Sequence, residues 1–235
     1  MTDILITGFT PFDGRPVNAS WVAARALCRR GQYRGHTLQA LEIPVCWGAP
    51  REALASSLQT QVPDLILSMG EGEPGIFRIE TRARNTRRER ADNAGRLPEG
   101  QPNSLSGPQE RLSSFASEAV CEALAAQGIP IRLSVDAGAY LCEELLYTLE
   151  EFREAQSGNL RVLFVHIPPF GTLLRYKGEE QTCSEALLDD FGLALLDAIL
   201  PQPCPRSRMS APLGCWNTRS PNSGRMASKW SKISA

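Results

Sequence analysis

Short apolar runs alternate with amphipathic segments through the first 200 residues of the chain. We expect strands at 4–7, 38–45, 64–69, 131–135 and 161–165, and helices at 19–30, 51–58, 140–152 and 184–199. Strand-like runs that are followed by helical patterns predict a parallel sheet covered by helices. The run at 64–69 is almost continuously apolar, as in a strand that is covered on both faces. The expected fold class is therefore α/β, a three-layer α/β/α sandwich with a mostly parallel central sheet.

Three segments interrupt this rhythm. Residues 76–85 alternate charged and uncharged side chains, so we expect an exposed hairpin or an extended arm beside the sheet. The segment 87–107 is expected to form a loop. Residues 201–235 are rich in Pro, Ser and basic side chains and lack any helix or strand period, which predicts a poorly ordered tail. We therefore expect a single α/β domain at 1–200, followed by this tail.

The charges are distributed unevenly along the chain. Of its 25 basic and 26 acidic residues, six basic and no acidic residues lie in 201–235, so the body of the protein is acidic. An acidic body is unlike the basic surfaces that bind nucleic acid, and we expect no nucleic-acid partner.

The first residues, MTDILITGF, lack the features of a signal peptide, and no apolar run has the length of a membrane span. We expect a cytoplasmic protein without a membrane partner.

The seven cysteines are scattered and include no C-x-x-C pair. This pattern fits neither a disulfide framework nor a zinc site, so we expect free thiols, no metal and no cofactor. Cys28, Cys121 and Cys183 fall within helical patterns and are interpreted as core residues. Cys142 differs, because it lies in the first turn of the helix expected after Gly138. The helix dipole and the unpaired amide groups of a first turn favour a thiolate, the reactive form of cysteine.

Ligand sites in open α/β sheets lie beyond the carboxyl ends of the strands. If the strands are parallel, the ends of the first, third, fourth and fifth expected strands share one edge, with Cys142 and His166 beyond two of them. The only other histidine, His36, lies in a polar turn, so a Cys-His pair would use His166. A structural histidine at a strand end is the alternative. Position alone does not select Glu80, for which a solvated ion-pair ladder is the default interpretation.

Four blocks of the sequence form a specific combination of motifs. They are Thr7–Gly14 with Asn18 downstream, Ile79–Asn85 with Arg90 downstream, Ser134–Cys142, and Val165–Pro168. Together they resemble the pyroglutamyl peptidase I family of cysteine peptidases, also called pyrrolidone carboxyl peptidases, in the family's order. The resemblance implies that residues 1–200 form a peptidase domain whose substrates are peptides with N-terminal pyroglutamate.

The resemblance also implies a catalytic triad. Cys142 would be the nucleophile, His166 the general base and acid, and Glu80 the carboxylate that orients the imidazole. The carboxylate of such a triad fixes the tautomer of the base and stabilises the imidazolium that forms. Glu80 is thus assigned by resemblance, since its position alone did not select it.

The substrate of the family is a neutral five-membered lactam, and the implied substrate-binding residues surround it. Phe9 and Phe12 would supply apolar walls for the ring. Asn18 and Glu71 belong to the same implied site, and Arg90 is a candidate for holding the developing oxyanion together with amide groups next to the nucleophile.

Some positions depart from the family pattern. Many relatives have a G-Q-A-G-like block where this chain has Gly70-Glu71-Gly72-Glu73, and a carboxylate there is expected to weaken binding of a neutral lactam. The segment 86–93 is more basic than usual. A pyroglutamyl-binding homologue with impaired catalysis therefore stays an alternative. A nucleoside- or phosphate-processing enzyme of similar architecture is disfavoured, because residues 8–14 match no phosphate-binding motif. The sequence leaves the oligomeric state open, a homo-oligomer included.

Overall fold

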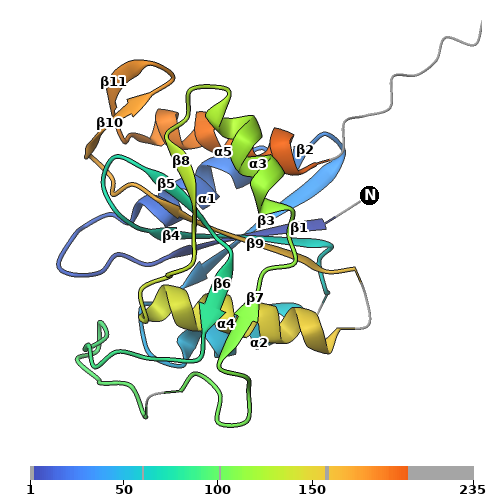
Figure 1. Cartoon of the computed structure of the whole chain (residues 1–235), viewed down its shortest axis with the longest axis vertical. Helices are drawn as coiled ribbons and strands as arrows, with labels where there is room; N and C mark the ends of the chain where they lie inside the picture. Colours follow the sequence, from blue (N-terminus) through green and yellow to red (C-terminus); the bar gives the residue numbers. More distant parts are fainter. Residues whose placement is uncertain (1–2, 60, 101, 157–158, 201–235) are drawn as a thin grey trace, which may run out of the picture. The chain divides into compact units, whose positions relative to one another are not determined.

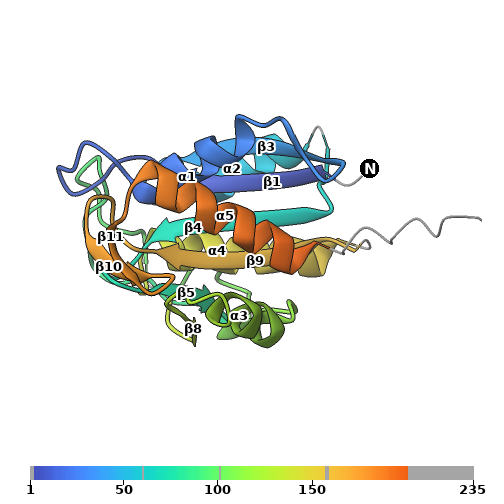
Figure 2. The ribbon, with the colours of Figure 1, turned by 90° about the horizontal axis from the view of Figure 1, so that it is seen from above.

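A seven-stranded sheet forms the centre of the computed structural model, which describes residues 3–59, 61–100, 102–156 and 159–200. Its strand order is β2-β3-β1-β4-β9-β5-β8, and Figure 2 shows β3, β1, β4, β9, β5 and β8 side by side. The strands of this sheet are β1 (Asp3–Phe9), β2 (Gln32–Tyr33), β3 (His36–Ile43), β4 (Leu65–Glu71), β5 (Phe77–Glu80), β8 (Ile131–Ser134) and β9 (Arg161–Ile167). The prediction of a poorly ordered tail at 201–235 lies outside the described residues.

The strand directions divide the sheet into two parts. Strands β3, β1, β4 and β9 run parallel to one another. Strand β5 is antiparallel to β9, and β8 is parallel to β5. Since most of the pairings are parallel, the prediction of a mostly parallel central sheet is confirmed, although its β5–β8 end runs in the opposite direction.

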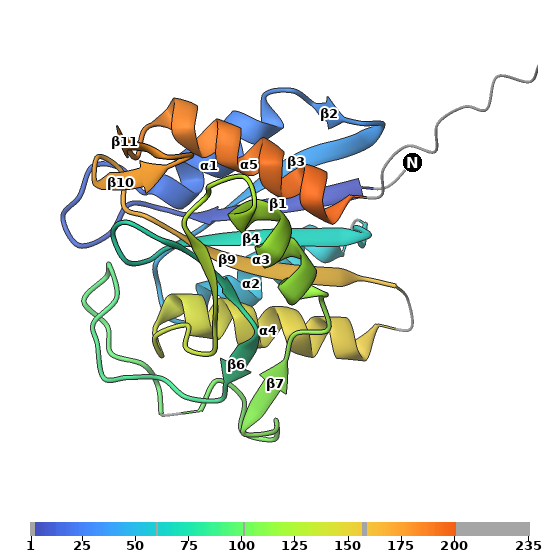
Figure 3. The same cartoon turned by 45° about the horizontal axis from the view of Figure 1, so that its top comes forward.

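Helices cover both faces of the sheet, as Figures 1 and 3 show. One face carries α1 (Ala19–Cys28), α3 (Ser117–Ala125) and α5 (Glu185–Ile199), and the other carries α2 (Ala49–Leu58) and α4 (Leu141–Ala155). Each set of helices buries its own apolar cluster against the strands. The prediction of a three-layer α/β/α sandwich is therefore confirmed.

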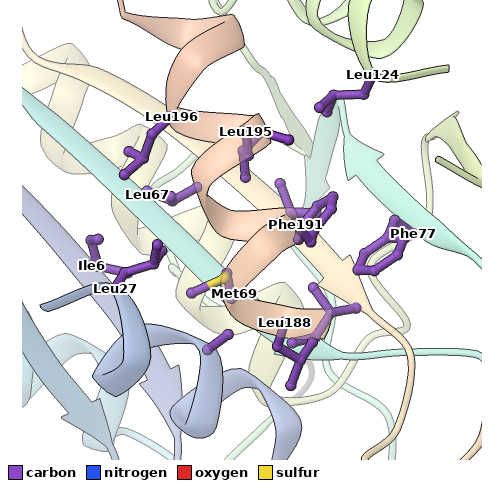
Figure 4. Close-up of a cluster of buried hydrophobic side chains, with 14 of the residues drawn as sticks. Ile6, Leu27, Leu67, Met69, Phe77, Leu124, Leu188, Phe191, Leu195 and Leu196 are labelled. Atoms are coloured by element: carbon purple, nitrogen blue, oxygen red, sulfur yellow. The ribbon is translucent and has the colours of Figure 1, made fainter. Parts of the chain in front are cut away.

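Strand β4 contributes to both of these clusters, which explains its almost continuous apolar sequence. Leu67 and Met69 pack in one cluster with Leu27 of α1 and Leu195 of α5 (Figure 4), while Ile66 belongs to the cluster on the opposite face. Burying a side chain of this size stabilises a protein by about 1.5–3 kcal/mol. The centre of the sheet is thus anchored from both sides.

The segment 76–85 is not an exposed arm, and this prediction is wrong. Phe77 and Ile79 are fully buried, and the Phe77 ring stacks on Phe191 of α5 with ring centroids 3.8 Å apart. These two apolar residues draw β5 into the central sheet, where Glu80 is also fully buried. The next strand, β6 (Arg82–Arg84), leaves this sheet and pairs with β7 (Glu110–Leu112).

Several elements lie outside the sequence-based predictions. They are β2, β7 and the hairpin formed by β10 (Leu173–Tyr176) and β11 (Glu179–Thr182). Cys121 lies in α3, in agreement with the helical pattern expected around it. The interpretation of Cys183 as a helical residue is wrong, because it lies between β11 and α5, although it is buried as expected. In the described part of 87–107 the chain forms neither helix nor strand, as predicted.

Candidate active site

The carboxyl ends of β1, β4 and β9 meet at one edge of the sheet. The prediction that β8 also ends at this edge is wrong, because β8 runs with β5, and β5 is antiparallel to β9. The last residue of β8 pairs with Glu80, which itself pairs with Phe164 inside β9. The segment 135–140 connects β8 to α4, and α4 places Cys142 beside Gly70 of β4. The expected juxtaposition is present, but a loop and a helix create it instead of a shared strand direction.

Cys142 is the second residue of α4, within the first turn as predicted. Tyr140 occupies the N-cap position and makes no side-chain hydrogen bond to the helix, so no side chain caps the first-turn amide groups. The helix dipole favours a thiolate at such a position. In contrast, burial raises the pKa of Cys28 to about 11 and that of Cys183 to about 12, which keeps both groups as thiols at neutral pH.

Two glycines allow the candidate catalytic groups to approach the sheet closely. A Cβ atom on Gly70 would lie 2.7 Å from Sγ of Cys142 and 3.3 Å from Cδ2 of His166. A Cβ atom on Gly72 would lie 2.8 Å from Cβ of His166. Any larger residue at these positions would displace the thiol or the imidazole. No pattern in the amino-acid sequence indicates this steric role.

His166 and Glu80 form a buried pair in the neighbouring strands β9 and β5. Nδ1 of His166 is 2.7 Å from Oε1 of Glu80, and the two side chains are 4% and 0% exposed. Because Nδ1 faces Glu80, Nε2 is the nitrogen left to face Cys142, and a Cβ atom on Gly70 would touch both Sγ of Cys142 and the ring of His166. The three residues that the family resemblance selected are therefore brought together.

The pKa of His166 is the outcome of opposing influences. Burial alone lowers it, because an imidazolium is poorly solvated inside a protein. The charges and hydrogen bonds of Cys142 and Glu80 outweigh burial and raise the pKa from 6.5 to about 9. His166 therefore keeps its proton at neutral pH. A protonated imidazole is the neighbour that favours the nucleophilic form of a cysteine.

Two buried carboxylates follow Cys142 directly in α4. Glu143 accepts a hydrogen bond from the backbone N–H of Arg84 at 2.6 Å and pairs with the Arg84 guanidinium at 3.1 Å. Glu144 pairs with Arg87 at 2.9 Å. Without these partners, two negative charges would disfavour the adjacent thiolate. Neither carboxylate was predicted to belong to the site, although acidic residues directly after a cysteine at a helix start indicate that nearby cations must compensate them.

The turn before α4 has a left-handed backbone. Gly138 and Ala139 have φ angles of 93° and 53°, and a left-handed conformation is unfavourable for alanine. The N–H of Ala139 donates to Glu143 at 3.1 Å, and its carbonyl accepts from the N–H of Arg88 at 2.8 Å. These bonds hold the turn from which α4 starts, and they thereby determine the position of Cys142.

A cavity of about 390 Å³ opens beside Cys142 and His166. Phe9 and Phe12 line it, together with Tyr140 of the α4 N-cap. Phe9 is buried, whereas Phe12 is partly exposed. The volume lies in the range of small-molecule sites. The cavity thus combines aromatic walls with the thiol and the imidazole.

Glu71 lines this cavity with its charge compensated. Its side chain is 1% exposed, pairs with Arg15 and accepts a hydrogen bond from the N–H of Ala19 at 2.8 Å. Burial raises the pKa of Glu71, while the Ala19 amide and Arg15 act in the opposite direction. The Arg15 guanidinium also lies 4.6 Å from the centroid of the Phe12 ring. The sequence did not reveal Arg15 as the partner of this carboxylate.

Asn18 lines the cavity but uses both ends of its amide within the protein. Its Oδ1 accepts a hydrogen bond from the N–H of Ser20 at 3.0 Å and thereby caps α1. Its Nδ2 donates to the carbonyl of Thr10 at 3.0 Å. Asn18 therefore shapes the cavity through the loop that carries Phe12.

Arg90 lines the cavity from the segment 87–93. Its guanidinium lies 4.5 Å from the centroid of the Tyr140 ring and 3.8 Å from the carboxylate of Asp13. Tyr140 in turn packs edge-on against Trp47, with ring centroids 5.2 Å apart. This stack of rings supports a cation at the rim of the cavity.

Within the described ranges, no cluster of three or more His, Cys, Asp or Glu side chains is arranged to hold a metal ion. Of the helices that the structure describes, none is both long enough and apolar enough to cross a membrane.

A thiol beside a buried histidine-carboxylate pair, at the edge of an α/β sheet, is the arrangement of a cysteine hydrolase. Comparison with known proteins defines the class further. Residues 2–187 match the model of the pyroglutamyl peptidase family, and the chain belongs to this family.

Individual relatives agree with this assignment. The chain is 34% identical to a pyrrolidone-carboxylate peptidase of Streptomyces coelicolor over 72% of this chain and 78% of the relative. It is 30% identical to that of Cupriavidus taiwanensis over 85% and 94% of the two chains. Among solved structures, pyroglutamyl peptidase I of Bacillus amyloliquefaciens superposes with a TM-score of 0.73 at 26% identity, covering 84% of this chain and 93% of the other.

Proposed function

We propose that this chain hydrolyses the amide bond after an N-terminal pyroglutamyl residue, with Cys142, His166 and Glu80 as its catalytic triad. The chain is a cysteine peptidase of the pyroglutamyl peptidase family. The observation that carries the proposal is that the Cys142 thiol and the His166 ring lie together beside Gly70, with Nδ1 of His166 2.7 Å from Glu80, at the wall of an aromatic cavity.

The proposed reaction begins with the thiolate of Cys142. The thiolate attacks the carbonyl carbon of the pyroglutamyl residue, and the oxyanion is held by amide groups at the start of α4 and by Arg90. The imidazolium of His166 gives its proton to the leaving amine, and a thioester remains on Cys142. His166 then takes a proton from water, which attacks the thioester and releases pyroglutamate. Glu80 holds the imidazole in one tautomer through both steps.

The part of the substrate that we expect the cavity to hold is the five-membered lactam ring of pyroglutamate, which is neutral. Phe9 and Phe12 supply flat apolar surfaces beside the nucleophile. The loop that carries Phe12 is held against the start of α1 by Asn18 and by Glu71. Arg15 compensates the charge of Glu71. A free N-terminal amine would carry a charge into this cavity. We therefore expect pyroglutamyl amides to be cleaved and prolyl amides not to be cleaved.

The proposed location is the cytosol. The cysteines at 28, 46, 121, 142 and 183 are free in the structure. Catalysis by a thiol needs a reduced nucleophile, and the cytosol maintains thiols in the reduced state.

The direct test is a release assay with a pyroglutamyl amide and a prolyl amide of the same leaving group. We expect release from the first substrate only, and no release by Cys142→Ala. Cys28→Ala is the matched control, because that thiol lies at the end of α1, outside the cavity, and it should retain activity. Binding of pyroglutamate without hydrolysis would instead identify an impaired homologue.

A further inference from the structure

Arg78 is a charged residue beside the catalytic pair to which the triad and the cavity walls assign no role. It lies in β5 directly opposite His166 of β9, lines the cavity and is 14% exposed. Its Nε is 3.7 Å from Oε1 of Glu80, the oxygen that faces Nδ1 of His166. A guanidinium and an imidazole therefore share one carboxylate oxygen.

Glu73 holds Arg78 from the outer side of the site. Nη1 of Arg78 lies 2.8 Å from one oxygen of Glu73, and Nη2 of Arg132 lies 3.3 Å from the other oxygen. Arg78 and Arg132 face each other in the pairing of β5 with β8, so Glu73 bridges two like charges. Arg78 is thus held between the exposed carboxylate of Glu73 and the buried carboxylate of Glu80.

We propose that Arg78 is a positioning residue that sets the protonation of His166 through Glu80, and that Glu73 limits this effect. The guanidinium offsets part of the negative charge that Glu80 presents to the imidazolium, and an imidazolium with a weaker counter-charge holds its proton less strongly. Glu73 draws the guanidinium outward and compensates its charge, so it acts in the opposite direction. The inference rests on the proposed function, because it gives Arg78 a task within the catalytic pair.

Among the described groups around His166, Arg78 is the one placed to offset the charge of Glu80. Cys142 of α4 and Glu80 of β5 both raise the pKa of His166. Glu71 of β4 is turned away towards Arg15 and the start of α1. In the described part of the chain, Arg78 is the one cation besides the imidazole that lies within ion-pair distance of Glu80. A change at Arg78 should therefore register on His166.

An NMR titration of the imidazole C–H signals measures the effect directly, since the chain has two histidines and His36→Gln assigns the signals. We expect Arg78→Gln to raise the pKa of His166 by about 0.5 unit or more. Glu73→Gln should lower it, and Arg78→Lys should keep it near the wild-type value because the charge is retained. Arg132→Gln is the matched control. It removes the other partner of Glu73, which is 56% exposed, and should shift the pKa less than Arg78→Gln does.

Equal pKa values for His166 in the wild type and in Arg78→Gln would overturn the proposal. So would shifts of the same sign in Arg78→Gln and Glu73→Gln, because general loosening of the site would move both variants in one direction. Glu73 is exposed, so its variant keeps the test available if Arg78→Gln does not fold. The titration needs no turnover: shifts of opposite sign in a protein that cleaves no pyroglutamyl amide would remove the proposed function and keep the coupling. In an active enzyme, the alkaline limb of kcat/KM should move with the same signs.

Discussion

Glu80 and His166 lie diagonally across the antiparallel pair of β5 and β9, with Oε1 of Glu80 2.7 Å from Nδ1 of His166. In register, Glu80 is opposite Phe164, two residues before His166 on the same face of β9. Diagonal neighbours have Cα atoms about 7–8 Å apart, a gap that a glutamate and a histidine side chain can close. The geometry of the proposed catalytic pair thus follows from the register of two strands.

Replacing Glu80 by Gln should lower kcat/KM for a pyroglutamyl amide by about 100- to 10,000-fold, because the imidazole loses the charge that fixes its tautomer and stabilises its protonated form. Steady-state kinetics with a pyroglutamyl amide measure the loss. Glu110→Gln is the control, since that exposed carboxylate in β7 pairs with Arg82 away from the cavity. A Glu80→Gln enzyme within tenfold of the wild type would contradict the assignment.

The pH dependence of activity should reflect the protonation of His166. Its pKa is raised from 6.5 to about 9. The imidazolium is therefore present at neutral pH and is lost as the pH rises through about 9. We therefore expect kcat/KM to fall above that pH. Replacing Cys142 by Ala removes a negative neighbour, so burial has more weight and the pKa of His166 should fall. An NMR titration in which this variant keeps a pKa of about 9 would show that the thiolate has no such influence.

Substitution of Gly70 by Ala should impair turnover while leaving the fold intact. The added Cβ would lie 2.7 Å from Sγ of Cys142, so the thiol must move away from its base. A misplacement of roughly 1 Å can lower the rate by about 100-fold. Kinetics combined with the melting temperature check the prediction. Wild-type kcat would show that α4 shifts freely, and a collapse of the melting temperature would point to a structural defect instead.

Glu71→Gln should raise KM for a pyroglutamyl amide by about three- to tenfold. Loss of the pairing with Arg15 should make the position of Phe12 less fixed and weaken substrate binding by roughly 1 kcal/mol. This sign is opposite to the one that the sequence alone favours, in which the carboxylate opposes a neutral lactam. The double variant Arg15→Gln/Glu71→Gln should be less impaired than the sum of the single variants, because the two residues form one contact. A lower KM in Glu71→Gln would support the sequence-based expectation.

The sequence predicted the layers of the fold because apolar periodicity reports how each segment is buried. It did not predict the reversed β5–β8 end of the sheet, because an alternating pattern carries no information on strand direction or partner. Segment 76–85 was also misinterpreted, because the charged Arg78 and Arg82 suggested an exposed segment, whereas Phe77 and Ile79 are buried. Burial of Phe77 against α5 depends on a helix more than one hundred residues later in the chain.

The residues of the candidate site also divide into those that could be predicted from the sequence and those that could not. Cys142 and His166 could be proposed from chemistry and position along the chain, whereas Glu80 required the resemblance to a family. The partners of the buried carboxylates were not predictable. Arg15 and Glu71 are 56 residues apart, and their pairing depends on how the loop after β1 meets the end of β4.

The reversed end of the sheet also bears on how the enzyme becomes active during folding. Glu80 and His166 are 86 residues apart, and Cys142 follows a strand that joins the sheet only through β5. Contacts between segments so distant in sequence form slowly, after local helices. A chain in which β5 and β8 have not yet docked lacks the carboxylate, and its thiol is not held against the imidazole. Peptidase activity should consequently return later than helical structure on refolding, so that unfinished chains are unable to cleave peptides.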